Sequence, residues 1–313
     1  MKVNLAEPRG FCAGVERAIR IVELALERFG APVYVRKEIV HNRTVVDGLK
    51  PKGAIFVDEL DQIPEGSVTI FSAHGVSPAV VQDAKDRGLH VIDATCPLVA
   101  KVHIEVLANV KNGTEIILIG HAGHEEVEGT MGEAPGRTHL VETVEDVAKL
   151  TFASDKPLAL VTQTTLSLDD TAHITAAVKE KYPQIRIPTK DDICYATQNR
   201  QHAIKQMVPT TDVFLILGAA NSSNSVRLQE VAESAGRTAY LIATAEALDP
   251  KWLDNAKTVG VSAGASAPES LVVELLEKLA ALGYDDTESI VFAQENVEFA
   301  LPPELVDTAV SNE

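Results

Sequence analysis

Three cysteines, Cys12, Cys96 and Cys194, are the side chains of this sequence best suited to hold a metal centre. Separated thiols of this kind can be interpreted in four ways. They can be small buried hydrophobes, ligands of a structural zinc ion, one catalytic thiolate with two bystanders, or ligands of an iron–sulfur cluster. A closed zinc site needs four ligands, and the sequence contains no C-x-x-C pair. A single nucleophile leaves two cysteines unexplained.

The cluster interpretation uses all three thiols. A cubane cluster usually takes four cysteines, so three would leave one iron without a protein ligand. Such an iron can act as a Lewis acid on a substrate oxygen as well as deliver electrons. Inert buried thiols are the remaining alternative, and they do not explain why the three cysteines occupy equivalent positions along the chain.

The polar loops between the hydrophobic segments are rich in neutral hydrogen-bond donors and nearly free of Lys and Arg. Hydroxyls, amides, imidazoles and backbone N–H groups at helix N-termini can bind a phosphate without a salt bridge. Helix capping explains each serine alone and is the better interpretation for Ser77. It does not explain why His41, His74 and His124 fall at matching loops. The other candidate donors are Thr164, Thr165, Ser222, Ser223, Asn224, Ser225 and Ser266.

The densest group of titratable residues runs from His121 to Gly129. A carboxyl beside a histidine in a partly dry pocket can keep a raised pKa and donate a proton. Glu126 and Glu128 are the candidates, and the alternative is that part of this acidic run only caps a helix. His121 and His124 could also ligate zinc, but no further ligand completes a known zinc motif.

Short β-branched runs alternate along the chain with longer amphipathic stretches, which predicts parallel sheets with crossover helices. The runs predicted as strands are residues 33–35, 68–71, 115–119, 158–161, 213–217 and 258–261. The stretches predicted as helices are residues 15–29, 79–87, 99–111, 170–181, 225–235 and 268–282.

Each cysteine opens a helix, which leads to a strand and then to a polar loop. The interval from cysteine to loop is 29, 28 and 30 residues in the three cases, and a second strand then ends in another polar loop. We therefore predict an α/β fold of three related units with mostly parallel sheets around a pseudo-threefold axis. Parallel sheets bind ligands beyond the carboxyl ends of their strands, so the cysteines and the six loops would meet at a central cluster site.

The predicted units are residues 1–95, 96–193 and 194–282, with residues 283–313 as a C-terminal tail. A length of 313 residues suits two or three domains. Strand–helix alternation alone could imitate a repeat, but it would not place a cysteine at the same register in each unit.

The charge balance excludes some classes of partner. Lys and Arg number 28 against 45 Asp and Glu, a net charge of −17, which argues against a nucleic-acid partner, and no basic run suits an anionic membrane surface. The sequence shows no signal-peptide pattern and no run of 18 apolar residues. Three cysteines do not suit a secreted disulfide framework. We expect a cytoplasmic protein.

Ordered motifs between residue 10 and about residue 282 resemble those of the 4-hydroxy-3-methylbut-2-enyl diphosphate reductases. This family performs the last step of the methylerythritol phosphate route to isoprenoids. The motifs are Cys12, His41-Asn42, Ser72-Ala73-His74-Gly75, Asp93-Ala94-Thr95-Cys96-Pro97, Gly123-His124, Glu126-Val127-Glu128-Gly129, Thr162-Gln163-Thr164-Thr165-Leu166-Ser167, Asp192-Ile193-Cys194-Tyr195-Ala196-Thr197, Asn221-Ser222-Ser223-Asn224-Ser225 and Gly264-Ala265-Ser266.

The resemblance implies an iron–sulfur reductase. Cys12, Cys96 and Cys194 would hold a [4Fe–4S] cluster with one open iron, which would take the substrate's hydroxyl. Glu126 would supply protons, with Thr164 near the hydroxyl as part of the relay and His124 beside them. Two electrons and two protons would convert the allylic diphosphate substrate to isopentenyl and dimethylallyl diphosphate. The diphosphate would be bound by His41, His74, His124, Ser222, Ser223, Asn224 and Ser266.

A ferredoxin or flavodoxin would supply the electrons, because the chain shows no flavin or nicotinamide motif. Carriers of these types are commonly acidic, so the acidic chain would need a local basic patch to dock one. Two other functions stay open at this point. One is a dehydratase that uses the open iron only as a Lewis acid, and the other is a sensor whose cluster catalyses nothing.

Overall fold

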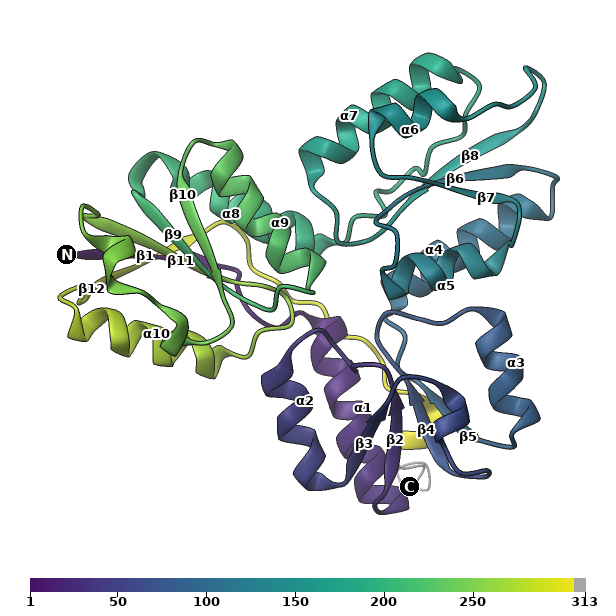
Figure 1. The fold of residues 1–313 in the computed structure, drawn as a ribbon, viewed down its shortest axis with the longest axis horizontal. Helices are drawn as coiled ribbons and strands as arrows, with labels where there is room; N and C mark the ends of the chain where they lie inside the picture. The colour runs from purple at the N-terminus through teal and green to yellow at the C-terminus, as the bar shows by residue number, and fades with distance from the viewer. Residues whose placement is uncertain (307–313) are drawn as a thin grey trace, which may run out of the picture.

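The computed structural model describes residues 1–306, which form three lobes that meet at a common centre (Figure 1). Each lobe contains its own β-sheet, and every pairing between named strands in this part of the chain is parallel. The predicted α/β fold of three parallel-sheet units is therefore confirmed. We call the lobes units 1, 2 and 3, in the order of their first helices.

Unit 1 contains a four-stranded sheet in the order β3-β2-β4-β5. Its strands are β2 (Val33–Arg36), β3 (Ala54–Val57), β4 (Val68–Phe71) and β5 (His90–Asp93). Its helices are α1 (Ala13–Phe29), α2 (Arg43–Leu49) and α3 (Pro78–Asp86). One hydrophobic cluster joins the sheet to α1 and α2, and a second joins it to α3.

Unit 2 contains a three-stranded sheet in the order β7-β6-β8. Its strands are β6 (Glu115–Ile119), β7 (Thr138–Val141) and β8 (Leu158–Thr162). Its helices are α4 (Pro97–Val110), α5 (Glu125–Glu133), α6 (Val144–Lys149) and α7 (Leu168–Lys181). Ile117 and Ile119 of β6 pack toward α7, and Ile116 and Leu118 pack toward α4. The strand is buried on both faces, which explains its continuous apolar sequence.

Unit 3 contains a five-stranded sheet in the order β10-β9-β11-β1-β12. Its strands are β9 (Val213–Leu217), β10 (Thr238–Ile242), β11 (Thr258–Ala263), β1 (Lys2–Glu7) and β12 (Asp286–Val291). Its helices are α8 (Tyr195–Met207), α9 (Ser223–Ser234) and α10 (Glu269–Ala281). Helices α8 and α9 lie on one side of the sheet and α10 on the other (Figure 1).

The three sheets share a common arrangement. The first strand after each cysteine helix lies between the second and third strands, as in β3-β2-β4, β7-β6-β8 and β10-β9-β11. A further segment lies beside the third strand of each trio: β5 in unit 1, Arg186 bridged to Ala159 in unit 2, and β1 in unit 3. Each of these segments leads directly to a cysteine, so the chain passes from one unit to the next at Cys96, Cys194 and Cys12.

This pairing differs from the predicted division at the two ends of the chain. Residues 2–7, expected in the first unit, form β1 in the sheet of unit 3, and β12, which belongs to the expected tail, extends that same sheet. The remainder of the expected tail, residues 307–313, lies outside the described residues. The division at residues 95 and 193 coincides with the passages between units, and the division into three domains stays a prediction.

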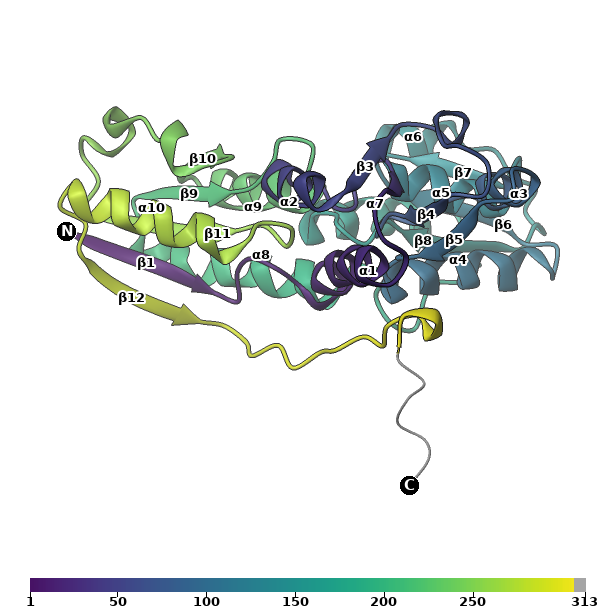
Figure 2. The same cartoon turned by 90° about the horizontal axis from the view of Figure 1, so that it is seen from below.

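Beyond β12 the chain runs through residues 292–302 to a short 3-10 helix, Pro303–Leu305. We call residues 292–305 the C-terminal strap. Figure 2 shows it running beneath the molecule from unit 3 to α1 of unit 1. Leu301 and Leu305 pack into the hydrophobic cluster around α1. Among the described helices, none combines the length and apolar character needed to cross a membrane.

Candidate active site

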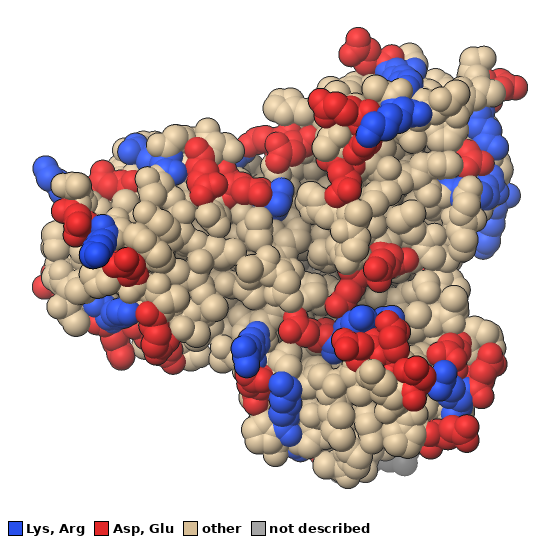
Figure 3. Space-filling model, viewed as in Figure 1, with Lys and Arg blue, Asp and Glu red and all other residues tan. Residues whose placement is uncertain are grey.

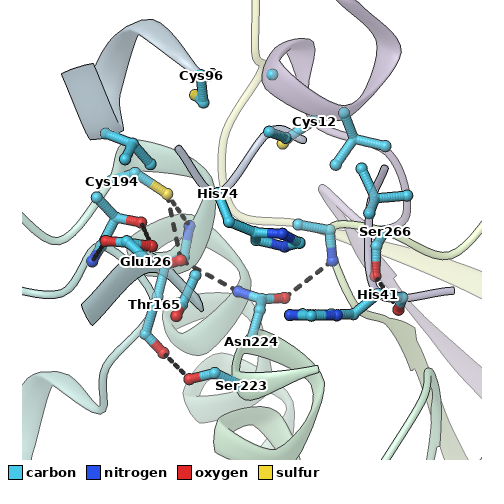
Figure 4. A pocket seen from close by; sticks show the side chains of 18 of the residues that line it. Cys12, His41, His74, Cys96, Glu126, Thr165, Cys194, Ser223, Asn224 and Ser266 are labelled. Atoms are coloured by element: carbon cyan, nitrogen blue, oxygen red, sulfur yellow. Dashed lines mark hydrogen bonds between the residues drawn. The ribbon is translucent and has the colours of Figure 1, made fainter. Parts of the chain in front are cut away.

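One cavity at the meeting point of the three units is lined by most of the residues that the sequence suggested for the site. Thr165 is among them, whereas His121, Glu128 and Ser225 are not. The cavity has a volume of about 100 Å³ and lies beyond the carboxyl ends of the strands, as parallel sheets predict. Figure 4 shows the cysteines on one side of it and His41, Asn224 and Ser266 on the other. The expected residues that line it are Cys12, His41, His74, Cys96, His124, Glu126, Thr164, Cys194, Ser222, Ser223, Asn224 and Ser266.

Two loops from each unit supply the polar residues. In unit 1, His41 follows β2 and His74 follows β4. The matching loops after β6 and β8 in unit 2 supply His124 with Glu126 and then Thr164, and those after β9 and β11 in unit 3 supply Ser222 to Asn224 and Ser266. The repeat that the spacing predicted therefore brings the six loops together.

The three cysteines occupy the same structural position, the N-cap of a helix. Cys12 caps α1, Cys96 caps α4 and Cys194 caps α8. All three are free thiols. Partial positive charge at a helix N-terminus favours a thiolate, so this position suits a metal ligand.

The sulfur atoms lie around a shared space. A Cβ atom placed on Gly14 would lie 2.8 Å from the Sγ of Cys96 and 3.8 Å from the Sγ of Cys12, so both sulfurs lie close to one point. Burial, followed by the charge of Cys12, raises the pKa of Cys194 to about 11. Burial also raises the pKa of Cys96 to about 12. Thiolates buried this closely need a nearby positive charge, which a metal centre provides.

The spacing of the sulfurs fits a cluster better than a single ion. Among residues 1–306, the group of ligand atoms gathered within 4.8 Å of one another belongs to His41, His74 and Glu125, and the three sulfurs form no such group. The ligands of one tetrahedral ion stand closer together than that, because each lies about 2.3 Å from the metal. An all-thiolate set with wider spacing fits an iron–sulfur cluster.

Glu126 is a buried acid joined to Thr164. The backbone N–H of Thr164 donates to Oε1 of Glu126 at 2.6 Å, and its hydroxyl donates to Oε2 at 2.8 Å. The side chain is only 2% exposed. Burial raises the pKa of Glu126 to about 7, although both hydrogen bonds from Thr164 oppose the shift. An acid with this pKa can hold and release a proton near neutral pH. Glu128, the other candidate, is exposed on the same helix.

Three histidines pack ring against ring in the cavity. His41 and His74 are stacked, with ring centroids 4.0 Å apart, and His124 meets both edge-on. A carboxylate accepts a hydrogen bond from each stacked ring: Glu38 from Nδ1 of His41 at 3.2 Å, and Glu125 from Nδ1 of His74 at 3.1 Å. These bonds fix the ring orientations and leave Nε2 of each ring for a ligand.

His124 is held differently. It is the N-cap of α5, and its Nδ1 accepts a hydrogen bond from the backbone N–H of Glu126 at 3.1 Å. This contact places the ring proton on Nε2. Burial, with the charges of His74 and His41, lowers the pKa of His124 to about 3. His124 is therefore a neutral donor at the pH of most cells.

The donors of unit 3 already make hydrogen bonds to the other units. Ser266 donates to the carbonyl of His41 at 3.0 Å, and Ser223 donates to the carbonyl of Thr165 at 3.0 Å. Asn224 instead bonds within unit 3: it donates to the Thr197 hydroxyl at 3.2 Å and accepts from the backbone N–H of Ala265 at 2.9 Å. The bonds from Ser266 and Ser223 join the loops of all three units. An anion that accepts hydrogen bonds from these two hydroxyls must displace the carbonyls that they contact here.

Sequence analysis did not single out three supporting residues. Glu38 and Glu125 orient the stacked histidines. Thr197 lies three residues after Cys194, and its hydroxyl is 3.2 Å from the Cys194 sulfur. A helix brings residues three apart onto one face, so the spacing of Thr197 could have revealed it. Nothing in the sequence distinguished Glu125 from the acidic residues that are common in the first turn of a helix.

Comparison with known proteins identifies the class. The family model described as LytB protein matches residues 3–280. A 4-hydroxy-3-methylbut-2-enyl diphosphate reductase of Aromatoleum aromaticum is 58% identical over 304 residues, 97% of each chain. Its namesake from Hahella chejuensis is 56% identical over 315 residues, 99% of each chain. The chain therefore belongs to the LytB family, a family of iron–sulfur oxidoreductases, and the predicted resemblance is confirmed.

Solved structures agree with this membership. The E-1-hydroxy-2-methyl-but-2-enyl-4-diphosphate reductase of Plasmodium falciparum superposes with a TM-score of 0.95 at 41% identity, over 97% of this chain and 96% of that one. A second solved structure, titled as the (E)-4-hydroxy-3-methyl-but-2-enyl diphosphate reductase that terminates the non-mevalonate pathway, has a TM-score of 0.64 at 33% identity. It covers 90% of this chain and 100% of its own.

Proposed function

We propose that this chain reduces 4-hydroxy-3-methylbut-2-enyl diphosphate to isopentenyl and dimethylallyl diphosphate. Two electrons and two protons enter, the C–O bond of the allylic alcohol breaks, a C–H bond forms and water leaves. The observation that carries the proposal is the convergence of three thiols, a buried acid and a histidine-rich loop set in one cavity of a LytB-family fold.

Cys12, Cys96 and Cys194 are the residues that would hold a [4Fe–4S] cluster. Their equivalent N-cap positions and their shared place in the lining of one cavity support this assignment. When bound, such a cluster supplies electrons and, at an iron without a protein ligand, a Lewis-acidic position.

Glu126 is the proton donor in this proposal, and Thr164 is its partner. Glu126 is protonated below a pH of about 7, and its two hydrogen bonds with Thr164 hold the carboxyl in one orientation. The hydroxyl of Thr164 lines the cavity and can pass a proton between the carboxyl and the substrate's hydroxyl. His124 lies beside this pair and donates from Nε2.

The diphosphate is bound by the three histidines and by Ser222, Ser223, Asn224 and Ser266. The cavity's lining residues include no Lys or Arg in the described part of the chain, so the anion is held by hydroxyl, amide and backbone N–H donors and by Nε2–H of His124. His41 and His74 already donate from Nδ1 to carboxylates, so each can donate from Nε2 as well only when its ring carries a second proton. Ser222 is the N-cap of α9, and a helix N-terminus offers backbone N–H groups and partial positive charge to an anion.

A ferredoxin or flavodoxin is the proposed electron donor, and a reducing cytoplasm suits the three free thiols. On the face shown in Figure 3, basic side chains gather at the outer edge of unit 2, and acidic side chains lie along the gaps between units. That distribution does not favour docking of an acidic carrier near the centre of this face.

An anaerobic assay with a reduced viologen dye tests the proposed function. We expect substrate consumption only when the reductant is present, with release of both five-carbon diphosphates. Turnover without reductant would instead identify a dehydratase. Absence of turnover with any donor, in a chain that carries iron, would point to a sensor.

A further inference from the structure

A cationic side chain follows each of the three cysteines at nearly the same distance along its helix. Arg17 lies on α1 five residues after Cys12, Lys101 lies on α4 five residues after Cys96, and Arg200 lies on α8 six residues after Cys194. The three positions are equivalent, because each lies on the helix that begins at the cysteine of its own unit. The proposed function uses none of them.

Each cation donates to the segment that leads to the next cysteine. Arg17 donates from Nη1 to the carbonyls of Ala94 at 3.3 Å and Thr95 at 3.1 Å, the two residues before Cys96. Those carbonyls belong to the passage from unit 1 to unit 2. The helix that begins at Cys12 therefore holds the approach to Cys96.

Lys101 makes the equivalent contacts one unit further on. Its Nζ donates to Oδ1 of Asp192 at 3.0 Å and to the carbonyls of Lys190 and Asp191 at 3.3 and 3.4 Å. Asp192 in turn accepts from the backbone N–H of Thr162 at the end of β8, at 3.0 Å. The helix that begins at Cys96 therefore holds the approach to Cys194.

Arg200 makes the equivalent contacts from unit 3 back to the segment before Cys12. Its guanidinium donates to the carbonyl of Gly10 at 2.7 and 3.2 Å and to that of Phe11 at 3.3 Å, the two residues before Cys12. The Arg200 side chain is fully buried. A buried guanidinium with all of these contacts fixes geometry strongly, because losing one partner leaves an uncompensated charge.

We propose that Arg17, Lys101 and Arg200 are positioning residues for the metal centre, which together fix the distances between the three cysteines. Each cysteine caps one helix, and the cation of the preceding unit donates hydrogen bonds to the loop just before that cysteine. Three such contacts form a closed ring, so no pair of cysteines can separate without breaking at least one cation's bonds. This inference rests on the proposed function, because it assumes that the cysteines hold a cluster.

The C-terminal strap supports two of the three cations. Arg200 donates from Nη1 to both oxygens of Glu295, at 3.1 and 3.2 Å, and Arg17 donates from Nε to the carbonyl of Ala300 at 2.7 Å. Lys101 has no strap contact among the described residues and instead lies 3.4 Å from Glu105 on its own helix. The strap therefore ties the first and last cysteine helices to each other.

Other basic residues on the same helices behave differently. Arg20 of α1 pairs with the exposed acids Glu23 and Glu27, and Lys205 of α8 pairs with Asp169 at the surface. Their contacts involve side chains rather than the carbonyls before a cysteine. Arg20→Gln is therefore the matched control for removal of charge from α1, and Lys205→Gln is the control for removal of a lysine whose partner is a surface carboxylate.

The test uses Arg17→Gln and Lys101→Gln, because these positions are less buried than Arg200 and their variants should fold. Both variants and both controls are loaded with iron and sulfide under anaerobic conditions. Three quantities are measured: the half-time for loss of the cluster's visible absorption in air, the electron paramagnetic resonance spectrum after reduction, and the thermal midpoint of the iron-free chain.

We expect the half-time in air to fall about 10-fold in each test variant, as for loss of a residue that orients a metal ligand. The resonance lines should broaden or shift, and Arg17→Lys and Lys101→Arg should restore part of the half-time. The controls should match the unaltered chain, and the half-times of the test variants should fall far more than any loss in the thermal midpoint of the iron-free chain accounts for.

Two results would overturn the inference. One is wild-type half-times and spectra in both test variants. The other is a shorter half-time that accompanies an equal loss of iron-free thermal stability and is not restored by the conservative variants, which would show a structural role only. If the unaltered chain takes up no cluster, the proposed function itself fails, and that outcome is visible before any variant is compared.

Discussion

Glu125 and Glu126 are neighbours in sequence but have opposite electrostatic environments. Burial alone would raise the pKa of Glu125, but the hydrogen bond from His74 and the charges of the nearby histidines hold it below its ordinary value. Glu126 faces Thr164 in a buried site, and its pKa rises to about 7. One residue is therefore a permanent carboxylate that orients a histidine, and the other is an acid that can release a proton.

Replacement of Glu126 by Gln should separate proton donation from cluster binding. The amide keeps the shape of the side chain but cannot transfer a proton as an acid. Turnover should therefore fall about 10²- to 10⁴-fold. Iron content should stay unchanged, because Glu126 contacts no proposed ligand by hydrogen bond. Near-normal turnover in this variant would remove Glu126 from the mechanism.

The pH profile offers a second test of the same residue. Only protonated Glu126 can donate, so the turnover of the unaltered enzyme should fall as pH rises through about 7. The raised pKa also means that the folded chain binds this proton more tightly than the unfolded chain. Folding stability should therefore decline between pH 4.5, the ordinary value, and about 7. In Glu126→Gln, the pH dependence of turnover, measured by steady-state rates, should weaken. The pH dependence of folding stability, measured by urea unfolding, should weaken as well.

His41 should affect substrate affinity and leave the metal centre intact. His41→Ala removes one ring of the stacked pair and should raise the dissociation constant of the diphosphate product about 10-fold, the effect of losing about 1.4 kcal/mol. His173→Ala, at an exposed position of α7, is the control. Unchanged product binding in His41→Ala, measured by calorimetry, would show that the proposed diphosphate site is wrong.

At the scale of elements, α1 shows how closely a helix start approaches the proposed cluster. Gly14 lies in the first turn of α1, and an added Cβ would lie 2.8 Å from the Cys96 sulfur. That contact is shorter than a side chain permits, so the sulfur would have to turn away from the position it takes as a ligand. The glycine is required by this approach and not by its backbone angles.

Gly14→Ala should therefore block the metal centre without harming the fold. Alanine favours a helix over glycine by up to about 1 kcal/mol, so the iron-free chain should be at least as stable as the unaltered one. Iron content after anaerobic loading should fall by more than half. Gly48→Ala, in α2 with no atom within 4 Å of its added Cβ, should load normally. Full iron content in Gly14→Ala would contradict the assigned position of Cys96.

The sequence predicted the interior strands other than β1, together with the fully buried edge strand β8, and missed the other edge strands. Strands β2, β4, β6, β8, β9 and β11 were all expected, because burial on both faces gives continuous apolar runs. The edge strands β3, β5, β7, β10 and β12 are less buried and carry weaker patterns. Strand β1 was missed although it is interior, since it contains the buried polar residue Asn4, whose side chain donates to Thr210 and Thr211.

The site was more predictable than the fold around it. Cysteine register and loop spacing indicated every proposed ligand and donor, because chemistry requires particular residue types there. Most partners of those groups were not predictable, since Glu38 and Glu125 act through contacts that only the folded chain creates. The same holds for Arg17, Lys101 and Arg200, which donate to backbone carbonyls and, for Lys101 and Arg200, to carboxylates about 90 residues away along the chain.

At the scale of the whole molecule, the first strand and the C-terminal strap both connect unit 3 to unit 1. Strands β1 and β12 pair within unit 3, and the strap then carries the chain to unit 1, where Leu305 is buried beside α1. Leu305→Ala should lower stability by about 2–4 kcal/mol through lost burial and a cavity. Val306→Ala, one residue further at an exposed position, should change the thermal midpoint little. Equal midpoints for the two variants would show that the strap does not stabilise unit 1.

The central claim is that Cys12, Cys96 and Cys194 hold one cluster at the meeting point of the units. The most direct measurement is the iron and acid-labile sulfide content of the chain prepared entirely without oxygen. We predict about four iron atoms and about four sulfides per chain, with marked loss when Cys194 is replaced by Ser. Iron well below one atom per chain in such material, or an active and fully loaded Cys194→Ser variant, would contradict the claim.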